Sequence, residues 1–216
     1  MHVISVVGQK GGAGKSTVAL HIAGCAEAAG IRTAIIDTDP QGSAHKWAER
    51  REAETPAVER ETDGDMLSVL AGRAAKNGID LLIIDTPGKA ETTALAACEL
   101  ADLILVPTRP TQFDLETLGT VKRTARIAEK LERAWVVLSQ CPTNSARPIE
   151  AGEAGVAGYG MHLAPVRFHQ RADFAYAMSE GRTATETEPL GKAAREADAL
   201  FAWIQTILPL KIKKAA

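Results

Sequence analysis

The sequence predicts a doubly wound α/β domain, with a mostly parallel sheet and helices on both of its faces. Short β-branched runs alternate with longer amphipathic stretches along the 216 residues. The runs, such as "HVISVV" and "LLIID", are apolar at consecutive positions, which is typical of parallel strands buried on both faces. The composition is 45% hydrophobic but only 4% aromatic, so aliphatic side chains must fill the core, which suits helices packed on such a sheet.

The expected elements follow one another in a regular order. Strands are expected at 2–7, 33–37, 81–85, 103–107, 135–139 and 162–166. Helices are expected at 15–29, 43–52, 65–76, 92–100, 114–131 and 191–207, and Pro209 should end the last one. Residues 142–160, rich in proline and glycine, should form a loop or a short helix. We expect one domain over 1–208 and a basic tail over 209–216, with right-handed crossovers between the strands.

Charge and cysteine content exclude several classes of protein. A formal net charge of −2 is not that of a polycation, so contact with nucleic acid would need a local patch or a dimer that joins two patches. Cys25, Cys98 and Cys141 are far apart and form no CxxC pair, which favours buried free thiols over a zinc site or disulfides. The sequence shows no basic leader and no apolar run of the ~20 residues that a membrane span needs. We therefore expect a cytoplasmic protein.

The stretch "GQKGGAGKST", residues 8–17, has the composition of a phosphate-binding loop. It departs from the pattern G-x-x-x-x-G-K-[ST] at one position, because Gln9 replaces the first glycine while "GKS" is intact. A strand precedes it and a helix follows, so backbone N–H groups and a helix N-terminus can face phosphates. A glycine-rich turn without a ligand is the alternative. The candidate nucleotide-binding residues are Gly11, Gly12, Ala13, Gly14, Lys15, Ser16 and Thr17.

The segment "KGGAGKST", residues 10–17, resembles the deviant Walker A loop KGGxGK[ST] of the ParA/MinD family of P-loop ATPases. The resemblance explains a second lysine that a minimal loop does not need. It implies that Lys10 crosses a dimer interface to the phosphates of the other subunit, where such a cation can contribute ~10³–10⁵ in rate. It also implies that Lys15 contacts the β- and γ-phosphates, that Ser16 ligates Mg²⁺, and that ATP and Mg²⁺ are the cofactors.

Two later strands end in carboxylates that complete the family's pattern. "IIDTDPQG" matches a D-x-D-P-Q segment, which implies that Asp39 orients the attacking water and that Asp37 supports either the Mg²⁺ shell or the loop. An ordinary aspartate, with a pKa of about 3.9, is a poor base at pH 7. "LLIIDTPG" is a Walker B pattern in which Asp85 would hold Mg²⁺ through a water and Gly88 could sense the γ-phosphate. Helix-capping aspartates are the alternative for the first segment.

The adenine pocket is predicted from two later segments that resemble the family's base-binding loops. Residues 139–142, which include Gln140, follow one strand, and the candidates Pro165, Val166 and Arg167 follow the next. Ordinary loop packing is the alternative for both segments. The resemblance as a whole covers nearly the entire chain, and its motifs are most specific over 1–41 and 81–88.

The size of the chain resembles that of short plasmid-partition ParA proteins. This implies an ATP-bound homodimer that binds DNA non-specifically, associates with the nucleoid, and is reset when a ParB-like partner stimulates hydrolysis. The phosphate loop follows the first strand, so we expect no operator-reading helix-turn-helix. Candidate DNA contacts are Arg167, Arg171, Arg182, Lys192, Arg195, Lys211, Lys213 and Lys214.

Other members of the wider family suggest alternatives. One is a MinD-like or other positioning ATPase that acts on a membrane or on a large protein assembly. The tail "LPLKIKKAA" has few apolar residues for a membrane-binding helix. A redox ATPase like the nitrogenase iron protein would need a cysteine near 85–95, and a bacterial tyrosine kinase would need terminal tyrosines; the sequence has neither.

Overall fold

A computed structural model describes residues 1–210, and they contain one seven-stranded parallel sheet. The strand order is β3-β2-β4-β1-β5-β6-β7, and every neighbouring pair is parallel. The predicted fold class is confirmed. The strands are β1 (His2–Val6), β2 (Thr33–Asp37), β3 (Ala57–Arg60), β4 (Leu81–Asp85), β5 (Leu103–Thr108), β6 (Ala134–Leu138) and β7 (His162–Leu163).

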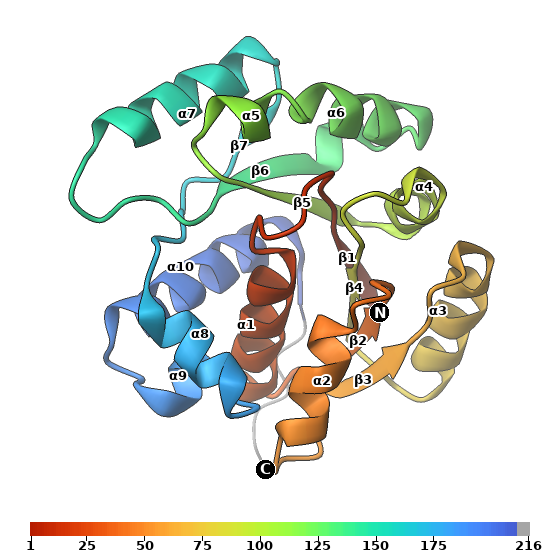
Figure 1. Ribbon diagram of the computed structural model, residues 1–216. Helices are drawn as coiled ribbons and strands as arrows, with labels where there is room; N and C mark the ends of the chain where they lie inside the picture. Colours follow the sequence, from red (N-terminus) through yellow and green to blue (C-terminus); the bar gives the residue numbers. More distant parts are fainter. Residues whose placement is uncertain (211–216) are drawn as a thin grey trace.

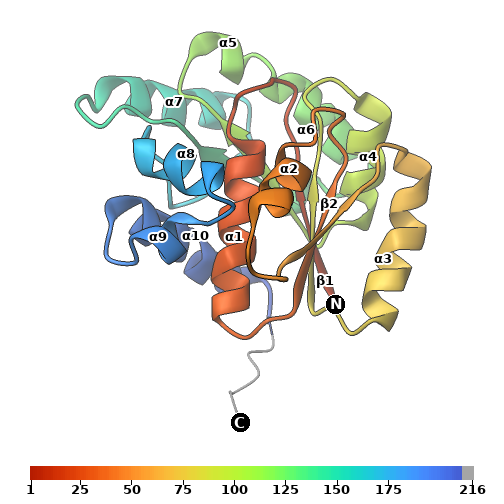
Figure 2. The ribbon, with the colours of Figure 1, turned by 60° about the horizontal axis from the view of Figure 1, so that its bottom comes forward.

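Helices cover both faces of the sheet (Figure 1). One layer holds α1 (Lys15–Ala28), α2 (Ser43–Arg50), α8 (Ala172–Ser179), α9 (Ala184–Thr187) and α10 (Lys192–Ile207). The other holds α3 (Leu67–Lys76), α4 (Glu91–Leu100), α5 (Gln112–Leu115), α6 (Leu118–Ile127) and α7 (Arg147–Gly158). Figure 2 shows α1 and α3 on opposite sides of the strands. Short 3₁₀ turns occur at η1 (Gly64–Met66) and η2 (Leu131–Arg133).

Each central strand sends alternate side chains into the two layers. In β4, Leu81 and Ile83 belong to the core that contains α1 and α10, whereas Leu82 and Ile84 belong to the core beside α3. All four are at most 1% exposed, so no position of this strand could carry an unpartnered polar side chain without cost. This explains the consecutive apolar residues of the strand sequences.

The segment 142–160 is more regular than its composition suggested. It contains α7, a twelve-residue helix. Pro148 lies in the first turn, where a missing N–H breaks no helical hydrogen bond. A Cβ on Gly152 would lie 2.8 Å from the side chain of Pro110, and one on Gly155 would lie 2.7 Å from that of Leu115. These glycines therefore serve close packing rather than helix termination.

Other elements differ from the sequence-based expectation. The single helix predicted over 114–131 is two helices, α5 and α6, and α6 ends before Glu129, whose φ is 57°. Strand β3 is an edge strand with the exposed, polar sequence AVER, which gave no apolar signal. Helices α8 and α9 were also missed, and β7 has two residues where five were expected. The last helix ends at Ile207, as Pro209 predicted.

The cysteine prediction is confirmed, because Cys25, Cys98 and Cys141 are all buried and free. Within residues 1–210, no helix has both the length and the apolar character needed to cross a membrane. Most of the expected basic tail, including Lys211, Lys213 and Lys214, lies outside the described residues.

Candidate nucleotide-binding site

The glycine-rich loop joins β1 to α1 at the carboxyl edge of the sheet. Gly12 and Gly14 have φ values of 73° and 88°, in the left-handed region that favours glycine. Gly14 is the N-cap of α1, and no side chain of the described residues 1–210 caps that helix end. The first N–H groups of α1 are thus left for an anion, and the helix dipole adds positive potential at the same place.

The loop is held from the side by residues that follow β6. The Ser139 hydroxyl donates a hydrogen bond to the Ala13 carbonyl at 2.7 Å, and the Gln140 side-chain amide donates to the Gly12 carbonyl. Gln140 has a φ of 49°, a left-handed backbone conformation that is uncommon for a residue other than glycine and is found in tight turns. Gln140, predicted to contact the base, therefore also fixes the phosphate loop.

The two lysines of the loop have different surroundings. Lys15 is 6% exposed, and its Nζ donates to the Lys10 carbonyl at 2.9 Å. Burial lowers the pKa of Lys15, and the carboxylates of Asp85 and Asp39 act in the opposite direction. The Nζ of Lys10 lies 3.6 Å from Asp114 Oδ2 and 5.6 Å from the ring centroid of Phe113, both on α5. Lys15 thus stays within the loop, and Lys10 reaches a neighbouring helix.

Asp37 is buried and supports the segment that carries Asp39. Its Oδ1 accepts from the Asp39 N–H at 3.1 Å, and its Oδ2 accepts from the His45 N–H in the first turn of α2 at 2.9 Å. The Asp39 side chain is only half-buried and accepts from the Gln41 N–H at 2.9 Å. Of the two roles considered for Asp37, this geometry favours support of the loop over direct metal binding.

Asp85 is fully buried, and neither of its carboxylate oxygens has a hydrogen-bond partner among the described residues. The pKa of Asp85 is raised to about 7, chiefly by burial and further by the charge of Asp37. The nearby Ser16 hydroxyl acts in the opposite direction, although it does not reach hydrogen-bond geometry to either carboxylate oxygen. An orphaned carboxylate beside a hydroxyl fits Mg²⁺, which binds one or two protein oxygens together with phosphate oxygens and waters. Ser16 and Asp85 are the residues that would hold it.

Gly88, in the segment after β4, packs directly on the phosphate loop. A Cβ at this position would lie 2.8 Å from the Gly11 nitrogen and 3.0 Å from the Lys10 carbonyl carbon. Backbone atoms cannot move aside as a flexible side chain can, so only glycine fits. The contact joins the predicted γ-phosphate-sensing segment to the loop that would bind the phosphates.

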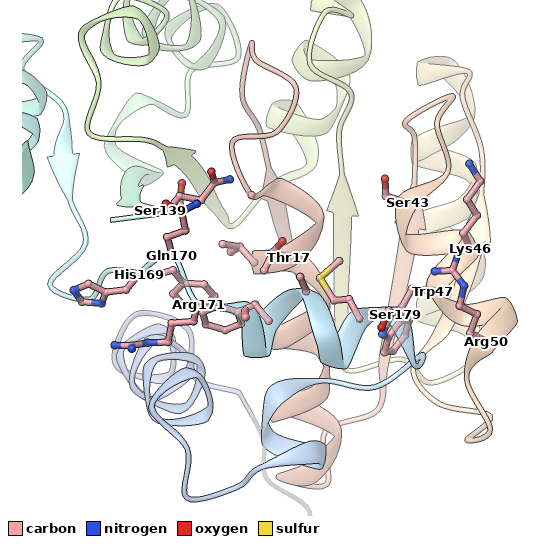
Figure 3. Close-up of a pocket in the computed structure, with 18 residues that line it drawn as sticks. Thr17, Ser43, Lys46, Trp47, Arg50, Ser139, His169, Gln170, Arg171 and Ser179 are labelled. Atoms are coloured by element: carbon pink, nitrogen blue, oxygen red, sulfur yellow. The ribbon is translucent and has the colours of Figure 1, made fainter. Parts of the chain in front are cut away.

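A cavity of about 750 Å³ opens beside the loop (Figure 3). Gly14, Thr17 and Gln140 line the end next to the phosphate loop, and Trp47 of α2 lines the other end. The remaining wall comes from the loop before α8 and from α8 itself, with Phe168, His169, Gln170, Arg171, Phe174 and Met178. Ser43, Lys46 and Arg50 lie beside Trp47 at the far end, so the cavity has polar groups at both ends. A largely apolar floor between polar groups suits a nucleoside.

Pro165 and Arg167 do not line this cavity. They line a separate one of about 220 Å³, where Arg167 forms an ion pair with Glu153 at 3.2 Å. Residues 168–171 form the cavity wall next to the phosphate loop. The candidates predicted from the sequence lie a few residues earlier in the same segment. The available signal was the run "FHQR" immediately before an amphipathic helix. Glu196 of α10 fixes this wall through His169 and Arg171, at 2.8 Å and 2.6 Å.

The cations predicted to contact DNA are not equally available. Arg171 is paired with Glu196, and Arg182 donates to the Glu186 carbonyl. Lys192 and Arg195, in the first turn of α10, are exposed and have no ion-pair partner among residues 1–210. They are the best-placed members of the predicted set within the described chain.

Comparison with known proteins agrees with the geometry. The chain is 32% identical over 203 residues to "Maintenance of carboxysome distribution protein A" of Gloeobacter kilaueensis, covering 91% of this chain and 89% of that protein. It is 31% identical over 121 residues to "Protein ParA" of Rhizobium radiobacter, covering 55% and 53%. The solved structure of the cell division ATPase MinD from Pyrococcus furiosus has a TM-score of 0.75 at 20% identity, over 96% of this chain and 99% of that one.

The sequence model of the CobQ/CobB/MinD/ParA nucleotide binding domain matches residues 4–163. This range contains the glycine-rich loop, both carboxylate-ended strands and the two residues after β6 that hold the loop. The chain therefore belongs to the CobQ/CobB/MinD/ParA nucleotide-binding family, as its phosphate loop and strand order indicated.

Proposed function

We propose that this protein is an ATP-dependent, dimerising switch that positions a cellular cargo along DNA. ATP and Mg²⁺ bind to one subunit, two loaded subunits pair, and slow hydrolysis separates them. The observation that carries the proposal is the position of Lys10. Its Nζ lies beside Asp114 of α5, whereas the ammonium of Lys15 stays on the loop backbone. A lysine held at the rim of the loop is suited to a second subunit's phosphates.

The catalytic assignment follows from the carboxylates. Asp85 and Ser16 would hold Mg²⁺, which would supply positive charge against the phosphate oxygens. Asp39, half-buried at the mouth of the site, orients the attacking water, and Asp37 keeps the Asp39 segment in place through two backbone hydrogen bonds. Lys10 of the paired subunit and Lys15 stabilise the charge that develops on the transferred phosphoryl group.

The paired state is proposed to bind DNA without sequence preference. Lys192 and Arg195 lie on an exposed turn, and pairing would join two such local basic patches although each chain has a net charge of −2. Binding would be strongly salt-dependent, because it would depend on neutralised phosphates. We expect the protein in the cytoplasm, associated with the nucleoid when ATP is bound.

The cargo is proposed from the relatives. One that aligns with nearly the entire chain is named for carboxysome distribution, and others, with lower coverage, are named for chromosome partitioning. We therefore favour cargo positioning as the general role, and an adaptor on the cargo, analogous to a ParB-like protein, as the stimulator of hydrolysis. Partition of a plasmid or chromosome region is the more specific form of the same proposal.

Light scattering of purified protein, with ATP, with ADP and without nucleotide, tests the switch. We expect dimers only with ATP and Mg²⁺. Lys15→Ala should fail to bind ATP, and Lys10→Ala should bind ATP but fail to pair productively. Normal pairing and hydrolysis by Lys10→Ala would refute the role of Lys10 at the partner's phosphates.

A separate DNA-binding experiment tests the link between the switch and DNA. Equal retention of the wild type on DNA with ATP and with ADP would refute that link.

A further inference from the structure

We propose that Glu196 of α10 is a positioning residue for the nucleoside, because its carboxylate holds residues 168–171 where they form the wall of the cavity of about 750 Å³. The inference rests on the proposed function, since it takes this cavity to be the nucleoside site. It adds that the base-dependent part of the affinity for ATP is set by a side chain that lies behind the wall, outside the lining of the cavity.

The backbone of the wall is paired with β6 on one side only. There the Cys141 N–H donates to the Phe168 carbonyl at 3.0 Å, and the Gln170 N–H donates to the Cys141 carbonyl at 2.8 Å. In such a parallel bridge the N–H of the middle residue, His169, points to the opposite side. The described residues place no further strand beyond this edge of the sheet, and Glu196 Oε2 accepts the N–H at 2.9 Å. The carboxylate thus takes the place of a missing strand's carbonyl.

Two side chains of the wall meet the same carboxylate. His169 and Arg171 are two positions apart in an extended segment, so they leave it on the same face, and Figure 3 shows both extending away from Thr17. Glu196 Oε1 accepts from His169 Nδ1 at 2.8 Å and from Arg171 Nη2 at 2.6 Å. Hydrogen bonds to an ionised acceptor are the stronger ones, and the Glu196 side chain is only 14% exposed to competing water. The wall is therefore clamped to α10 at two positions.

Loss of the carboxylate would free one side of the wall and leave the other in place. The backbone bonds to Cys141 would remain, as would the stacking of Phe168 on Phe174, whose ring centroids lie 4.9 Å apart. The bonds to α10 would be lost. A nucleoside would then have to order the wall when it binds, and its dissociation constant rises as the ordered fraction falls. Glu196 therefore acts by preorganising the cavity.

The phosphate loop does not depend on this clamp. Ser139 and Gln140 hold residues 10–17 from the end of β6, through hydrogen bonds to two carbonyls of the loop. Inorganic tripolyphosphate resembles the phosphate chain of ATP but has no base or ribose, so it probes the loop alone. The clamp should therefore affect the affinity for ATP and leave the affinity for tripolyphosphate unchanged.

The clamp itself can be tested without nucleotide. Glu196→Ala removes the acceptor of the His169 N–H, so we expect hydrogen exchange of that amide, followed by NMR, to accelerate at least about tenfold, as for the loss of a hydrogen bond to a charged group. Amides of β4 should exchange as in the wild type if the fold is intact. Glu153→Ala is the matched control, because Glu153 pairs with Arg167, just before the wall, and lines the separate cavity of about 220 Å³. An unchanged His169 rate in Glu196→Ala would overturn the clamp.

Isothermal titration in the presence of Mg²⁺ tests the effect on the nucleoside. Glu196→Gln keeps an oxygen for the His169 N–H but removes the charge, so we expect it to weaken ATP binding about tenfold and tripolyphosphate binding by less than about twofold. Glu196→Ala should weaken ATP binding further, because it also removes that oxygen. Glu153→Gln should bind both ligands as the wild type does. Unchanged ATP affinity in both Glu196 variants would overturn the inference, as would equal losses for ATP and tripolyphosphate.

These outcomes distinguish the inference from the proposed function. If the wild type binds neither ATP nor tripolyphosphate, the proposed switch and the effect on affinity both fail, and hydrogen exchange still decides the clamp. If the wild type binds the two equally well, the phosphate loop stands and the cavity is not a nucleoside site, so the inference fails. If the wild type and Glu196→Gln prefer ATP over tripolyphosphate by the same factor, the proposed function stands and the inference fails.

Discussion

Asp37 and Asp85 end two adjacent parallel strands directly opposite each other, but within residues 1–210 only the carboxylate of Asp37 accepts hydrogen bonds. Asp37 accepts from two backbone N–H groups of the segment that leads into α2. The carboxylate of Asp85 is equally buried, but neither of its oxygens has a hydrogen-bond partner among residues 1–210. The same residue type at the same level of the sheet thus has two uses. One carboxylate stabilises a loop, and the other is available for a cation.

Asp85→Asn should abolish the effect of Mg²⁺ on nucleotide binding. The amide has no charge to offer the cation, so we expect the wild type to lose at least about tenfold in ATP affinity on addition of EDTA and the variant to lose nothing. Isothermal titration with and without Mg²⁺ measures this. The variant's unfolding temperature without nucleotide should not fall, because a buried unpartnered carboxylate is itself unfavourable. Equal EDTA sensitivity in both proteins would contradict the assignment of Asp85.

Asp39→Ala should retain ATP and accumulate as a dimer. Asp39 lies at the half-buried mouth of the site, and its side chain accepts from the nearby Gln41 N–H, so its removal should leave the phosphate loop intact. Without an oriented water, hydrolysis should slow by two orders of magnitude or more, as for other positioned acid–base groups, where the effect is about 10²–10⁴. Light scattering and phosphate release measure the two effects. A monomeric variant with ATP bound would argue against this role.

Gly88→Ala should lower nucleotide affinity by about tenfold or more while the protein remains folded. The added methyl group meets the backbone of Gly11 at 2.8 Å, so the phosphate loop must shift. Gly72→Ala on α3 is the matched control, because a Cβ there meets no atom of the described part of the chain within 4 Å. That control should bind ATP normally and gain about 0.5–1 kcal/mol of stability from helix propensity. Fluorescent-nucleotide titration and circular dichroism measure both; normal binding by Gly88→Ala would show that the loop accommodates the methyl group.

Reversal of charge at Lys192 and Arg195 should weaken DNA retention without affecting ATP-dependent pairing. Each lost phosphate contact should make the log–log salt slope shallower by about 0.9. Arg123→Glu, an exposed site on α6 in the opposite helix layer, is the control for a nonspecific change of net charge. Fluorescence anisotropy on duplexes of unrelated sequence at several salt concentrations gives the slope. If the α6 control weakened binding as much as the α10 variants, the contact surface would lie elsewhere.

His21 should make folding stability pH-dependent between about pH 6.5 and 4. It is fully buried, its Nδ1 donates to the Thr17 carbonyl at 2.8 Å, and its Nε2 accepts from the Ala184 N–H at 3.0 Å. Burial lowers its pKa from 6.5 to about 4. Below pH 6.5 the unfolded chain therefore binds a proton that the folded protein does not.

As a result, stability should fall with decreasing pH, by up to about 3 kcal/mol in total, since a pKa difference of one between the folded and unfolded states corresponds to about 1.4 kcal/mol. Urea denaturation at pH 7.5, 6.0 and 5.0 measures the trend. His21→Gln carries no titrating group and should show a smaller loss between the first and last pH. An identical loss in both proteins would assign the pH dependence to other residues.

The local features of the chain could be predicted because they depend on near neighbours in sequence. The bounds of β4 match the prediction, and α1 ends one residue early, since buried strands and an uncapped helix after a glycine-rich loop each have a short-range signature. The strand β3 and the helix α7 could not be predicted in the same way. The first is an exposed edge, and the second uses glycines for contacts with Pro110 and Leu115, which are distant in sequence.

The sequence by itself determined the fold class, the phosphate loop and the identity of its two lysines and three carboxylates. Spacing and residue type are enough for these, because they reflect which backbone conformations and which ionic groups the chain can offer. Only the tertiary structure decided how they are used: that Lys10 contacts Asp114, that the Asp85 carboxylate has no hydrogen-bond partner within residues 1–210, and that 168–171 rather than Pro165 and Arg167 line the cavity. Those outcomes depend on burial and on contacts between distant segments, which exist only once the layers have packed on the sheet.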